Sequence, residues 1–200
     1  MAKEKNSQKL SKQLKKQWQG QFPKKIKDYV VKNLEIEGQP ALLDVGCANG
    51  DLLAMLYDQY DFYGTGLDVS EEMIQLAKEK HPAFNFFVGA AEQLPFPDDA
   101  YDIIVCSASF HHFTDPLRFL REAERVLRPD GRLVIAEIRI PLYDLRKLYN
   151  KRLEKQTADV EEEVKVYSQR ELEELFEEAE FYMEDQKNTL QIQYYELKKQ

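Results

Sequence analysis

Hydrophobic and polar residues follow two different spacings along the chain. Short apolar runs rich in β-branched and aromatic residues are typical of buried strands, and they lie at 41–45, 62–69, 84–88, 101–107 and 132–138. The stretches between most of them carry apolar residues at helical spacing. Strand, helix and strand repeat four times, which predicts an α/β domain with a mainly parallel sheet. The near-continuous apolar character of the strands indicates that helices cover both faces.

Local signals mark the ends of two predicted helices. Ser70 precedes "EEMIQLAKEK", whose first turn holds two acids, so Ser70 is expected to be an N-cap. Asp115 and Pro116 open "PLRFLREAERVL" in the same way. The residues "RPDG" at 128–131 predict a turn that ends this second helix.

The last third of the chain has a different order of elements. "SQRELEELFEEAE" predicts a helix, and "FYMEDQKN" and "TLQIQYYELKK" predict two strands joined by a short link, hence an antiparallel pair. The predicted fold class is therefore a Rossmann-like, seven-stranded, mostly parallel sheet with helices on both faces and an antiparallel last strand pair. Residues 141–167 predict a helical insert between the fifth strand and the next helix.

The length and the first residues define the expected domain organisation. Two hundred residues suffice for one domain with a sizeable core, so we expect a single domain over 1–200. Residues 1–35 predict a basic N-terminal helical arm, and an apolar stripe that recurs every four residues should dock this arm on the body; it consists of Leu10, Leu14, Trp18 and Phe22.

The net charge of −8 hides an asymmetry between this arm and the rest of the chain. Residues 1–27 carry nine lysines against one glutamate, a local charge of +8, which leaves −16 for the remainder. A body this acidic is a poor general nucleic-acid binder, although the arm alone leaves such a partner open.

The composition also predicts where the protein works. No apolar run approaches the roughly 18–20 residues of a membrane span. The first residues lack the apolar core of a secretory signal. Cys47 and Cys106 are interpreted as unpaired thiols in a reducing compartment. These features predict a cytoplasmic protein without a membrane partner.

The stretch "LLDVGCANGD" at 42–51 is the first candidate for ligand binding. It lies beyond the first predicted strand and opens a helix, the place where open α/β sheets bind ligands. Gly46 permits a tight turn, and Ala48 keeps the loop thin enough for a ligand to approach. Asp68, at the end of the second strand, can accept hydrogen bonds from both hydroxyls of a ribose. The combination predicts an adenine nucleoside as ligand.

The position of Asp51 separates two such ligands. The dinucleotide fingerprint places a pyrophosphate on the helix N-terminus, where the carboxylate of Asp51 would repel it. S-adenosylmethionine (SAM) has no phosphate and carries a positive sulfonium, and Asp44 with its small-residue loop suits its amino acid tail. SAM is therefore the predicted cofactor, and an NAD-dependent oxidoreductase is the alternative that Asp51 disfavours.

Five segments in order carry a family resemblance: "LLDVGCANGD", "GLDVSEEMIQLAK", "GAAEQLPFPDDAYDIIVCS", "HHFTDPLRFLREAERVLRPDGRLVI" and "YSQRELEELFEEAEF". Over roughly residues 41–181 the chain resembles a class I SAM-dependent methyltransferase, in the group that includes the ubiquinone and menaquinone C-methyltransferases. The resemblance implies a methyltransferase, EC 2.1.1.-, and says little about the methyl acceptor.

The resemblance also implies a set of cofactor-binding residues. Around the methionine part of SAM it places Asp44, Gly46, Asn49 and, in the same loop, Gly50, with the backbone of Ser107 at the methionyl end. For the adenosine it implies Asp68 at the ribose, Val69 beside the adenine, and Ala90 and Ala91 at the adenine edge. The chain departs from the family pattern at three positions, Ala48 and Glu180, where the family has glycine, and Ala90, where it has an acid or amide.

The catalytic candidates are His111 and His112, just after the fourth strand. A histidine there can take a proton from an acceptor, and it can equally be a loop histidine that bonds a carbonyl group. The residues after this strand are "SASF" rather than the Asp/Asn-Pro-Pro-aromatic pattern of nucleobase and glutamine N-methyltransferases. Cys106 is predicted to lie inside a strand, which disfavours it as a catalytic nucleophile. A small molecule is therefore the predicted acceptor, and no cluster with metal-ligand spacing predicts a metal.

The insert at 141–167 is expected to cover the acceptor. Side chains in and just before the insert could reach an anionic or aromatic substrate, and the alternative is that the tyrosines pack the insert onto the body; the candidates are Arg139, Tyr143, Arg146 and Tyr149. Two alternative functions stay open. One is an RNA or protein methyltransferase that uses the basic arm, and the other is a non-catalytic SAM-binding module.

Overall fold

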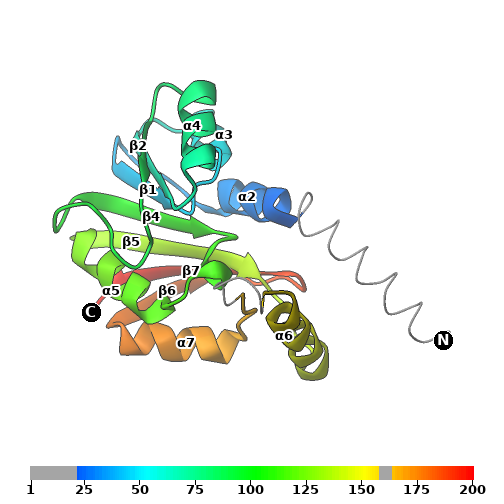
Figure 1. Cartoon of the computed structure of the whole chain (residues 1–200). Helices are drawn as coiled ribbons and strands as arrows, with labels where there is room; N and C mark the ends of the chain where they lie inside the picture. Colours follow the sequence, from blue (N-terminus) through cyan, green and yellow to red (C-terminus); the bar gives the residue numbers. More distant parts are fainter. Residues whose placement is uncertain (1–21, 158–163) are drawn as a thin grey trace.

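A seven-stranded sheet forms the centre of this computed structural model, which describes residues 22–157 and 164–200 (Figure 1). The strand order is β3-β2-β1-β4-β5-β7-β6. The strands are β1 (Ala41–Val45), β2 (Tyr63–Asp68), β3 (Asn85–Val88), β4 (Tyr101–Ser107), β5 (Leu127–Ile138), β6 (Phe181–Gln186) and β7 (Ile192–Lys199).

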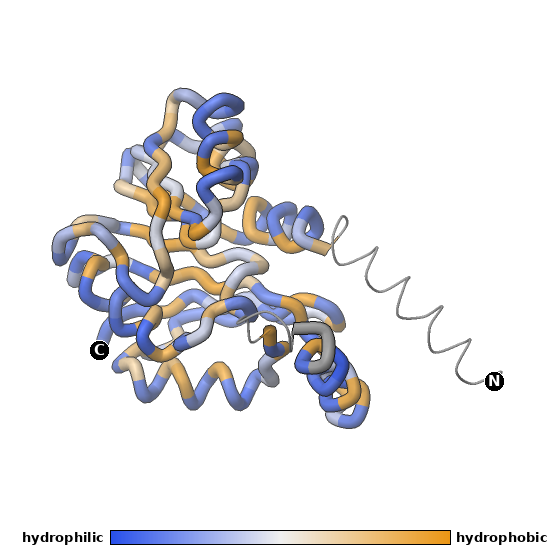
Figure 2. The backbone as a smooth tube through the Cα atoms, in the orientation of Figure 1, coloured by the Kyte–Doolittle hydropathy of each residue, from blue (hydrophilic) through white to orange (hydrophobic). Residues whose placement is uncertain are grey.

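Helices cover both faces of the sheet. In Figure 1, α2, α3 and α4 lie on one side and α5 and α7 on the other, while α6 lies at the end of the molecule near the tip of β5. The helices are α2 (Phe22–Asn33), α3 (Asp51–Tyr57), α4 (Glu71–Lys80), the 3-10 helix η1 (Phe110–His112), α5 (Pro116–Val126), α6 (Tyr143–Thr157) and α7 (Gln169–Glu178). Each face buries its own apolar cluster, and Figure 2 shows hydrophobic residues concentrated along the central strands.

The directions of the strands confirm the predicted fold class. The five strands from β3 to β5 pair in parallel. β7 pairs antiparallel with both β5 and β6. The strand order reverses between β1 and β4, so the loops that follow these two strands diverge and leave space for a ligand.

The two predicted helix caps are present. The Ser70 side chain accepts a hydrogen bond from the Met73 amide at 3.3 Å, and the Asp115 side chain accepts one from the Arg118 amide at 3.0 Å. Both caps satisfy amides that would otherwise lack a partner at the start of a helix. Such contacts span three residues, which explains why the sequence alone predicts them.

The turn predicted at 128–131 takes a different form. α5 ends at Val126 as expected, but Leu127 already pairs with Tyr101 as the first residue of β5. The register then jumps to Arg132 opposite Ile103, so residues 128–131 form an irregular bulge inside the strand.

The N-terminal arm lies only partly within the described residues. α2 buries Ile26 and Val30 against the sheet, which agrees with an amphipathic helix docked on the body. Leu10, Leu14 and Trp18 lie outside the described residues. Over the described ranges, no helix has the length and apolar character needed to cross a membrane.

Candidate cofactor site

A cavity of about 550 Å³ opens where the strand order reverses, beyond the carboxyl ends of β1 and β2. It is lined by Val45, Gly46, Ala48, Leu67, Asp68, Val69, Gly89, Ala90, Ala91, Glu92, Ala108, Ser109, His112, Phe113 and Thr114. Its size lies in the range of small-molecule and cofactor sites. Five predicted cofactor residues and one predicted catalytic histidine meet in this cavity.

Gly46 sits at the narrowest point of the loop after β1. Its φ of +75° lies in the left-handed region, and a β-carbon built on it would lie 2.4 Å from the β-carbon of Ser109. The Ser109 hydroxyl donates to the Val45 carbonyl at 3.0 Å and thereby ties the loop after β4 to the loop after β1. Glycine is therefore required at position 46 for conformation and for space.

Asp68 holds the two loops that border the cavity. Its carboxylate accepts hydrogen bonds from the amide of Ala48 at 2.8 Å and from the amide of Ser70 at 2.9 Å. Ala48 itself has a φ of +47°, a backbone conformation that explains the glycine that the family prefers at this position. Asp68 thus has a positioning role in addition to the ribose-binding role predicted from the sequence.

Asp44 is a buried carboxyl group without a full set of partners. Its side chain is 2% exposed, and its Oδ2 atom makes no hydrogen bond. Burial raises the pKa of Asp44 to about 7, with Lys27 opposing the shift and Asp68 adding to it. An orphaned carboxylate at this depth fits the ammonium group of a zwitterionic ligand, because a buried acid is costly unless a donor or a cation meets it.

Asp51 opens α3 as predicted, but its carboxylate faces other side chains and not the cavity. Its carboxylate bonds to Lys80 at 2.7 Å and to His81 at 3.1 Å, away from the cavity lining. Burial raises its pKa, but the bonds from Lys80, His81 and Asn49 prevail and lower the pKa to about 2. The charge of Asp51 is therefore compensated within the protein. The expectation that this carboxylate would repel a pyrophosphate ligand no longer follows.

The other predicted cofactor residues divide into two groups. Val69, Ala90 and Ala91 line the cavity on the side of β2 and β3, and Val69 is 74% exposed, an open apolar surface on which a flat ring can pack. Asn49 bonds to Asp51 at the start of α3, and Gly50 caps that helix with a φ of +76°. Neither of these two residues lines the cavity.

Ser107 is buried and does not line the cavity either. Its side chain is 5% exposed, and its hydroxyl makes no hydrogen bond. The two residues that follow, Ala108 and Ser109, form the lining. Ala108 has a φ of +55°, so the chain leaves β4 in a strained conformation that points residues 108 and 109 toward the cavity.

The structure distinguishes the two candidate histidines. His111 is 6% exposed, and its Nδ1 lies 2.8 Å from Oε2 of Glu137, a buried carboxylate whose other oxygen accepts from the Phe110 amide. His112 is partly open to solvent and lines the cavity. The ring centroids of the two histidines are 4.1 Å apart.

The surroundings of His112 keep it neutral near pH 7. Partial burial and the neighbouring His111 lower the pKa of His112 to about 4, while Glu137 and Asp68 act in the opposite direction. A neutral imidazole at the cavity wall can accept a proton. Glu137 was missed by the sequence analysis, although an acid within the apolar run "RLVIAEI" is a signal that it has a buried partner.

Neither of the two cysteines has the properties of a reactive thiol. Both are buried and unpaired. Burial raises the pKa of each thiol above its usual value, so neither supplies a thiolate. The interpretation of Cys106 as a core residue is confirmed.

Comparison with known proteins identifies the domain. The sheet order with an antiparallel β7 defines a Rossmann-like methyltransferase fold. The crystal structure of YcgJ from Bacillus subtilis matches with a TM-score of 0.68 and 27% identity, covering 82% of this chain and 71% of that chain. A family model described as "Methyltransferase domain" matches residues 43–135. The matched part of the chain is thus similar to class I SAM-dependent methyltransferases, in agreement with the resemblance seen in the sequence.

Two relatives with known names show which proteins the chain resembles. A demethylmenaquinone methyltransferase from Chlorobaculum tepidum is 36% identical over 119 residues, which cover 59% of this chain and 49% of that protein. A 27-O-demethylrifamycin SV methyltransferase from Amycolatopsis mediterranei is 30% identical over 119 residues, which cover 56% and 44%. The chain thus spans about half the length of the curated relatives that it matches.

Proposed function

We propose that this protein transfers the methyl group of SAM to a small-molecule acceptor. The observation that carries the proposal is the orphaned carboxylate of Asp44. Asp44 does not itself line the cavity, but it directly precedes Val45 and Gly46, which do. Both named relatives act on small molecules, according to their names, a menaquinone precursor and a rifamycin. When bound, SAM supplies an electrophilic methyl group on a sulfonium, and no further cofactor is needed for the transfer.

Different residues in and around the cavity would bind different parts of SAM. Asp44 would meet the ammonium group, and Gly46, without a side chain, would let the methionine part approach the backbone. Asp68 would accept from the ribose while it keeps its bonds to the loop amides. Val69 would pack on the adenine, with Ala90 and Ala91 at its edge. The absence of an acceptor side chain at Ala90 removes one hydrogen bond, on the order of 1 kcal/mol.

His112 is the proposed general base, since it lines the cavity in its neutral form. It would remove a proton from the hydroxyl, amine or activated carbon of the acceptor, which raises the electron density at the attacking atom. His111 and Glu137 would hold His112 in position, because their buried pair fixes the 3-10 helix η1 to which His112 belongs. They are positioning residues in this proposal.

Calorimetry and product analysis test the proposal together. S-adenosylhomocysteine should bind with a micromolar dissociation constant, about −8 kcal/mol, and NAD should bind far more weakly. Incubation with SAM and a metabolite extract should yield a methylated product detected by mass spectrometry. Tighter binding of NAD would refute the cofactor, and binding without any product would favour a non-catalytic SAM-binding module.

The role of His112 requires a separate variant. His112→Gln should lower the methyl-transfer rate by roughly 10²–10⁴-fold, the usual contribution of general base catalysis. The affinity for S-adenosylhomocysteine should change less than twofold. A rate within threefold of the wild type would exclude His112 as the base.

A further inference from the structure

A second, smaller cavity lies outside the cofactor site, between the end of β5, the first turns of α6 and the start of α7. Its volume is about 170 Å³. Three arginines but no aspartate or glutamate contribute to its lining, and we call it the arginine pocket: Arg139, Arg146 and Arg170 with Ser168, Gln169 and Gln193. In a protein whose net charge is −8, such a lining favours an anion.

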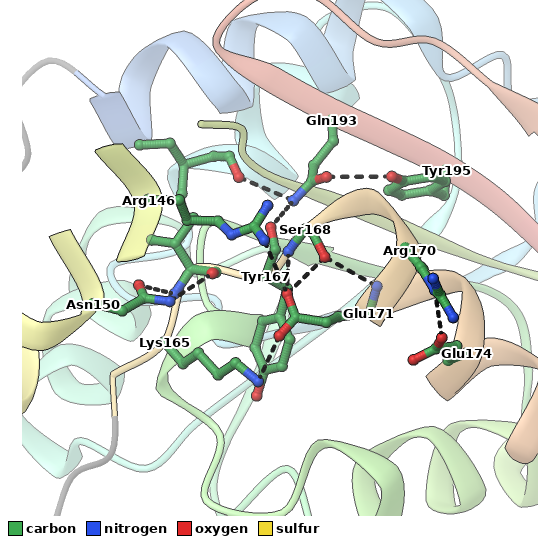
Figure 3. A network of polar contacts seen from close by, with 12 residues as sticks. Arg146, Asn150, Lys165, Tyr167, Ser168, Arg170, Glu171, Glu174, Gln193 and Tyr195 are labelled. Carbon is green, nitrogen blue, oxygen red and sulfur yellow. Dashed lines mark hydrogen bonds and ion pairs between the residues drawn. The ribbon is translucent and has the colours of Figure 1, made fainter. Parts of the chain in front are cut away.

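In the part of the chain that the structure describes, Arg146 is a guanidinium in this pocket without a hydrogen bond, and besides an ionic contact it has only the Tyr143 ring, whose centroid is 6.0 Å from its Cζ. Its side chain is only 16% exposed. Within the described residues it makes no hydrogen bond, and its closest ionic contact joins Nη2 to Glu171 Oε2 at 3.7 Å, beyond hydrogen-bond distance (Figure 3). A guanidinium carries five N–H donors, so a mostly buried one without hydrogen bonds is in a costly state that a ligand would relieve.

Glu171 gives Arg146 an ionic contact but no hydrogen bond, because the oxygen nearest to Arg146, Oε2, already accepts two other hydrogen bonds. Its carboxylate accepts from the backbone amide of Ser168 at 2.8 Å, from the Ser168 hydroxyl at 2.6 Å and from Lys165 at 3.0 Å. Burial raises the pKa of Glu171, but these bonds prevail and lower it to about 2. Glu171 thus stays ionised in the capping box of α7, and Figure 3 shows its contacts on the side of Ser168 and Lys165.

Arg139 offers a second set of donors to the pocket. Among the described residues its guanidinium has one hydrogen bond, from Nη1 to the Thr189 carbonyl at 2.9 Å, which holds the side chain in place and leaves its other donors available. Arg170 is 88% exposed and bonds to Glu174, so it contributes positive charge to the pocket but does not position a ligand. Arg139 and Arg146 form the core of the site, since planar guanidinium groups bind oxyanions bidentately.

Residues 165–167 and η1 lie between the arginine pocket and the cofactor cavity and contact each other. Tyr167 lines the pocket, and its ring centroid lies 5.5 Å from that of Phe110 in η1. The Lys165 amide donates to the His111 carbonyl at 3.0 Å. His112, the next residue, lines the cofactor cavity. A ligand anchored at the arginines therefore lies behind the same η1 segment that borders the proposed methyl donor.

We infer that the arginine pocket binds the anionic group, a carboxylate or a phosphate, of the methyl acceptor. The inference rests on the proposed function and adds to it the chemical class of the acceptor. A cavity of this size accommodates one oxyanion and a few adjoining atoms. The remainder of the acceptor would leave the pocket and pass over η1 to reach His112, which is exposed.

The first test measures the anion site without catalysis. Inorganic phosphate and acetate are titrated separately into protein with ¹⁵N-labelled arginine at constant ionic strength, and the Nε–H signals are followed by NMR. At least one anion should shift the Arg146 signal saturably, with a millimolar dissociation constant, and the stronger one identifies the preferred group. The absence of a saturable shift with both anions would overturn the inference.

Matched variants distinguish specific anion binding at Arg146 from nonspecific attraction of anions to positive charge. Arg146→Gln should weaken anion binding at least tenfold, whereas Arg146→Lys, which keeps the charge but not the planar fork, should weaken it less. Lys151→Gln removes one positive charge from an exposed position on the same helix, outside the pocket lining, and should change binding less than twofold. Equal losses in Arg146→Gln and Lys151→Gln would overturn the inference. Circular dichroism confirms that each variant is folded.

The second test concerns the acceptor. A metabolite extract is divided by ion exchange into anionic and non-anionic fractions, and each is incubated with protein and methyl-labelled SAM. Label should enter the anionic fraction, and Arg146→Gln should raise the acceptor KM at least tenfold while the dissociation constant of S-adenosylhomocysteine stays within twofold. Label that enters only the non-anionic fraction would overturn the inference. Failure to bind S-adenosylhomocysteine, with anion binding intact, would instead refute the proposed function.

Discussion

The two ends of the proposed site are built in different ways. The cofactor end consists of loops that directly follow β1, β2 and β4, and backbone groups make many of its contacts, such as the Ala48 amide on Asp68. The acceptor end consists of α6 and residues 164–168. The Asn150 amide joins these two parts to each other, and the Lys165 amide bonds the segment to His111 of the body. The family model at 43–135 covers the first and stops short of the second. The comparison teaches that the cofactor end belongs to the shared fold, whereas the acceptor end depends on this particular chain.

The largest effect is expected at Asp44. Asp44→Asn removes the proposed partner of the ligand ammonium and should weaken S-adenosylhomocysteine binding at least ~100-fold, about 3 kcal/mol. The same change should stabilise the ligand-free protein at pH 8. The reason is that the folded pKa is about 7 against 3.8 for the unperturbed group, so the folded state carries a costly buried charge at pH 8. We expect a gain of roughly 1–3 kcal/mol in urea unfolding.

Loss of both stability and binding in this variant would contradict the first half of the comparison. It would mean that Asp44 serves the packing of the sheet and not the ligand.

The pH dependence of cofactor binding should follow the same carboxyl group. Below its pKa of about 7, Asp44 must release a proton before it meets an ammonium. The affinity for S-adenosylhomocysteine should therefore be constant above pH 7 and fall up to about tenfold per pH unit below it. Calorimetry between pH 5.5 and 8.5 measures this slope. The Asp44→Asn protein is the control, and its weaker binding should change little over the same range.

Glycine substitutions test whether the cofactor end is as tightly packed as the structure indicates. Gly46→Ala and Gly38→Ala have matching φ angles of +75° and +69°, but only position 46 has a neighbour within 4 Å of the new β-carbon. Gly38→Ala should cost about 1 kcal/mol, from backbone conformation alone. Gly46→Ala should cost roughly 2–4 kcal/mol, because Ser109 must move. Urea unfolding measures both, and equal losses would indicate that the two loops are not in firm contact.

The acceptor end should respond to the loss of one tether. Asn150 bonds through both atoms of its amide to the backbone of Val166, at 3.0 Å each. Asn150→Ala should lower the unfolding free energy by about 1–2 kcal/mol and leave the affinity for S-adenosylhomocysteine within twofold. Hydrogen exchange should show faster opening of α6 and residues 164–168 alone. Equally faster exchange in β1 and β4 would show that the two ends are one cooperative unit.

The smallest effect is expected where the chain departs from the family's glycines. Ala48 and Glu180 have φ angles of +47° and +60°, so glycine relieves strain at both positions. Ala48→Gly and Glu180→Gly should each stabilise the protein by roughly 0.5–1 kcal/mol in urea unfolding. Ala48→Gly should leave cofactor affinity within twofold, since the Asp68 bond uses the backbone amide. A destabilisation in either variant would indicate that the native side chain makes a contact that outweighs the strain.

The sequence predicted what depends on short-range patterns. Strand β1 was predicted with its observed bounds, and the caps Ser70 and Asp115 were recognised because each bonds three residues ahead. The cavity residues Gly46 and Asp68 follow from their places at the ends of predicted strands. Periodicity and capping carry this information within a few residues.

Contacts between distant residues could not be predicted in this way. Asp51 is neutralised by Lys80 and His81 across two helices, and no local pattern reveals that pairing. His111 is buried against Glu137, which lies in β5, far along the chain, so no local pattern favoured His112 over His111.

The contact between Gly46 and Ser109 has a consequence for the history of the protein. A β-carbon at position 46 would occupy the space of the Ser109 side chain, so the two positions constrain each other across the sheet. A lineage that first exchanges Ser109 for glycine removes the clash and leaves alanine at 46 with the cost of its backbone conformation alone, whereas the reverse order meets both costs at once. The order in which substitutions arise therefore decides which descendants of this loop survive.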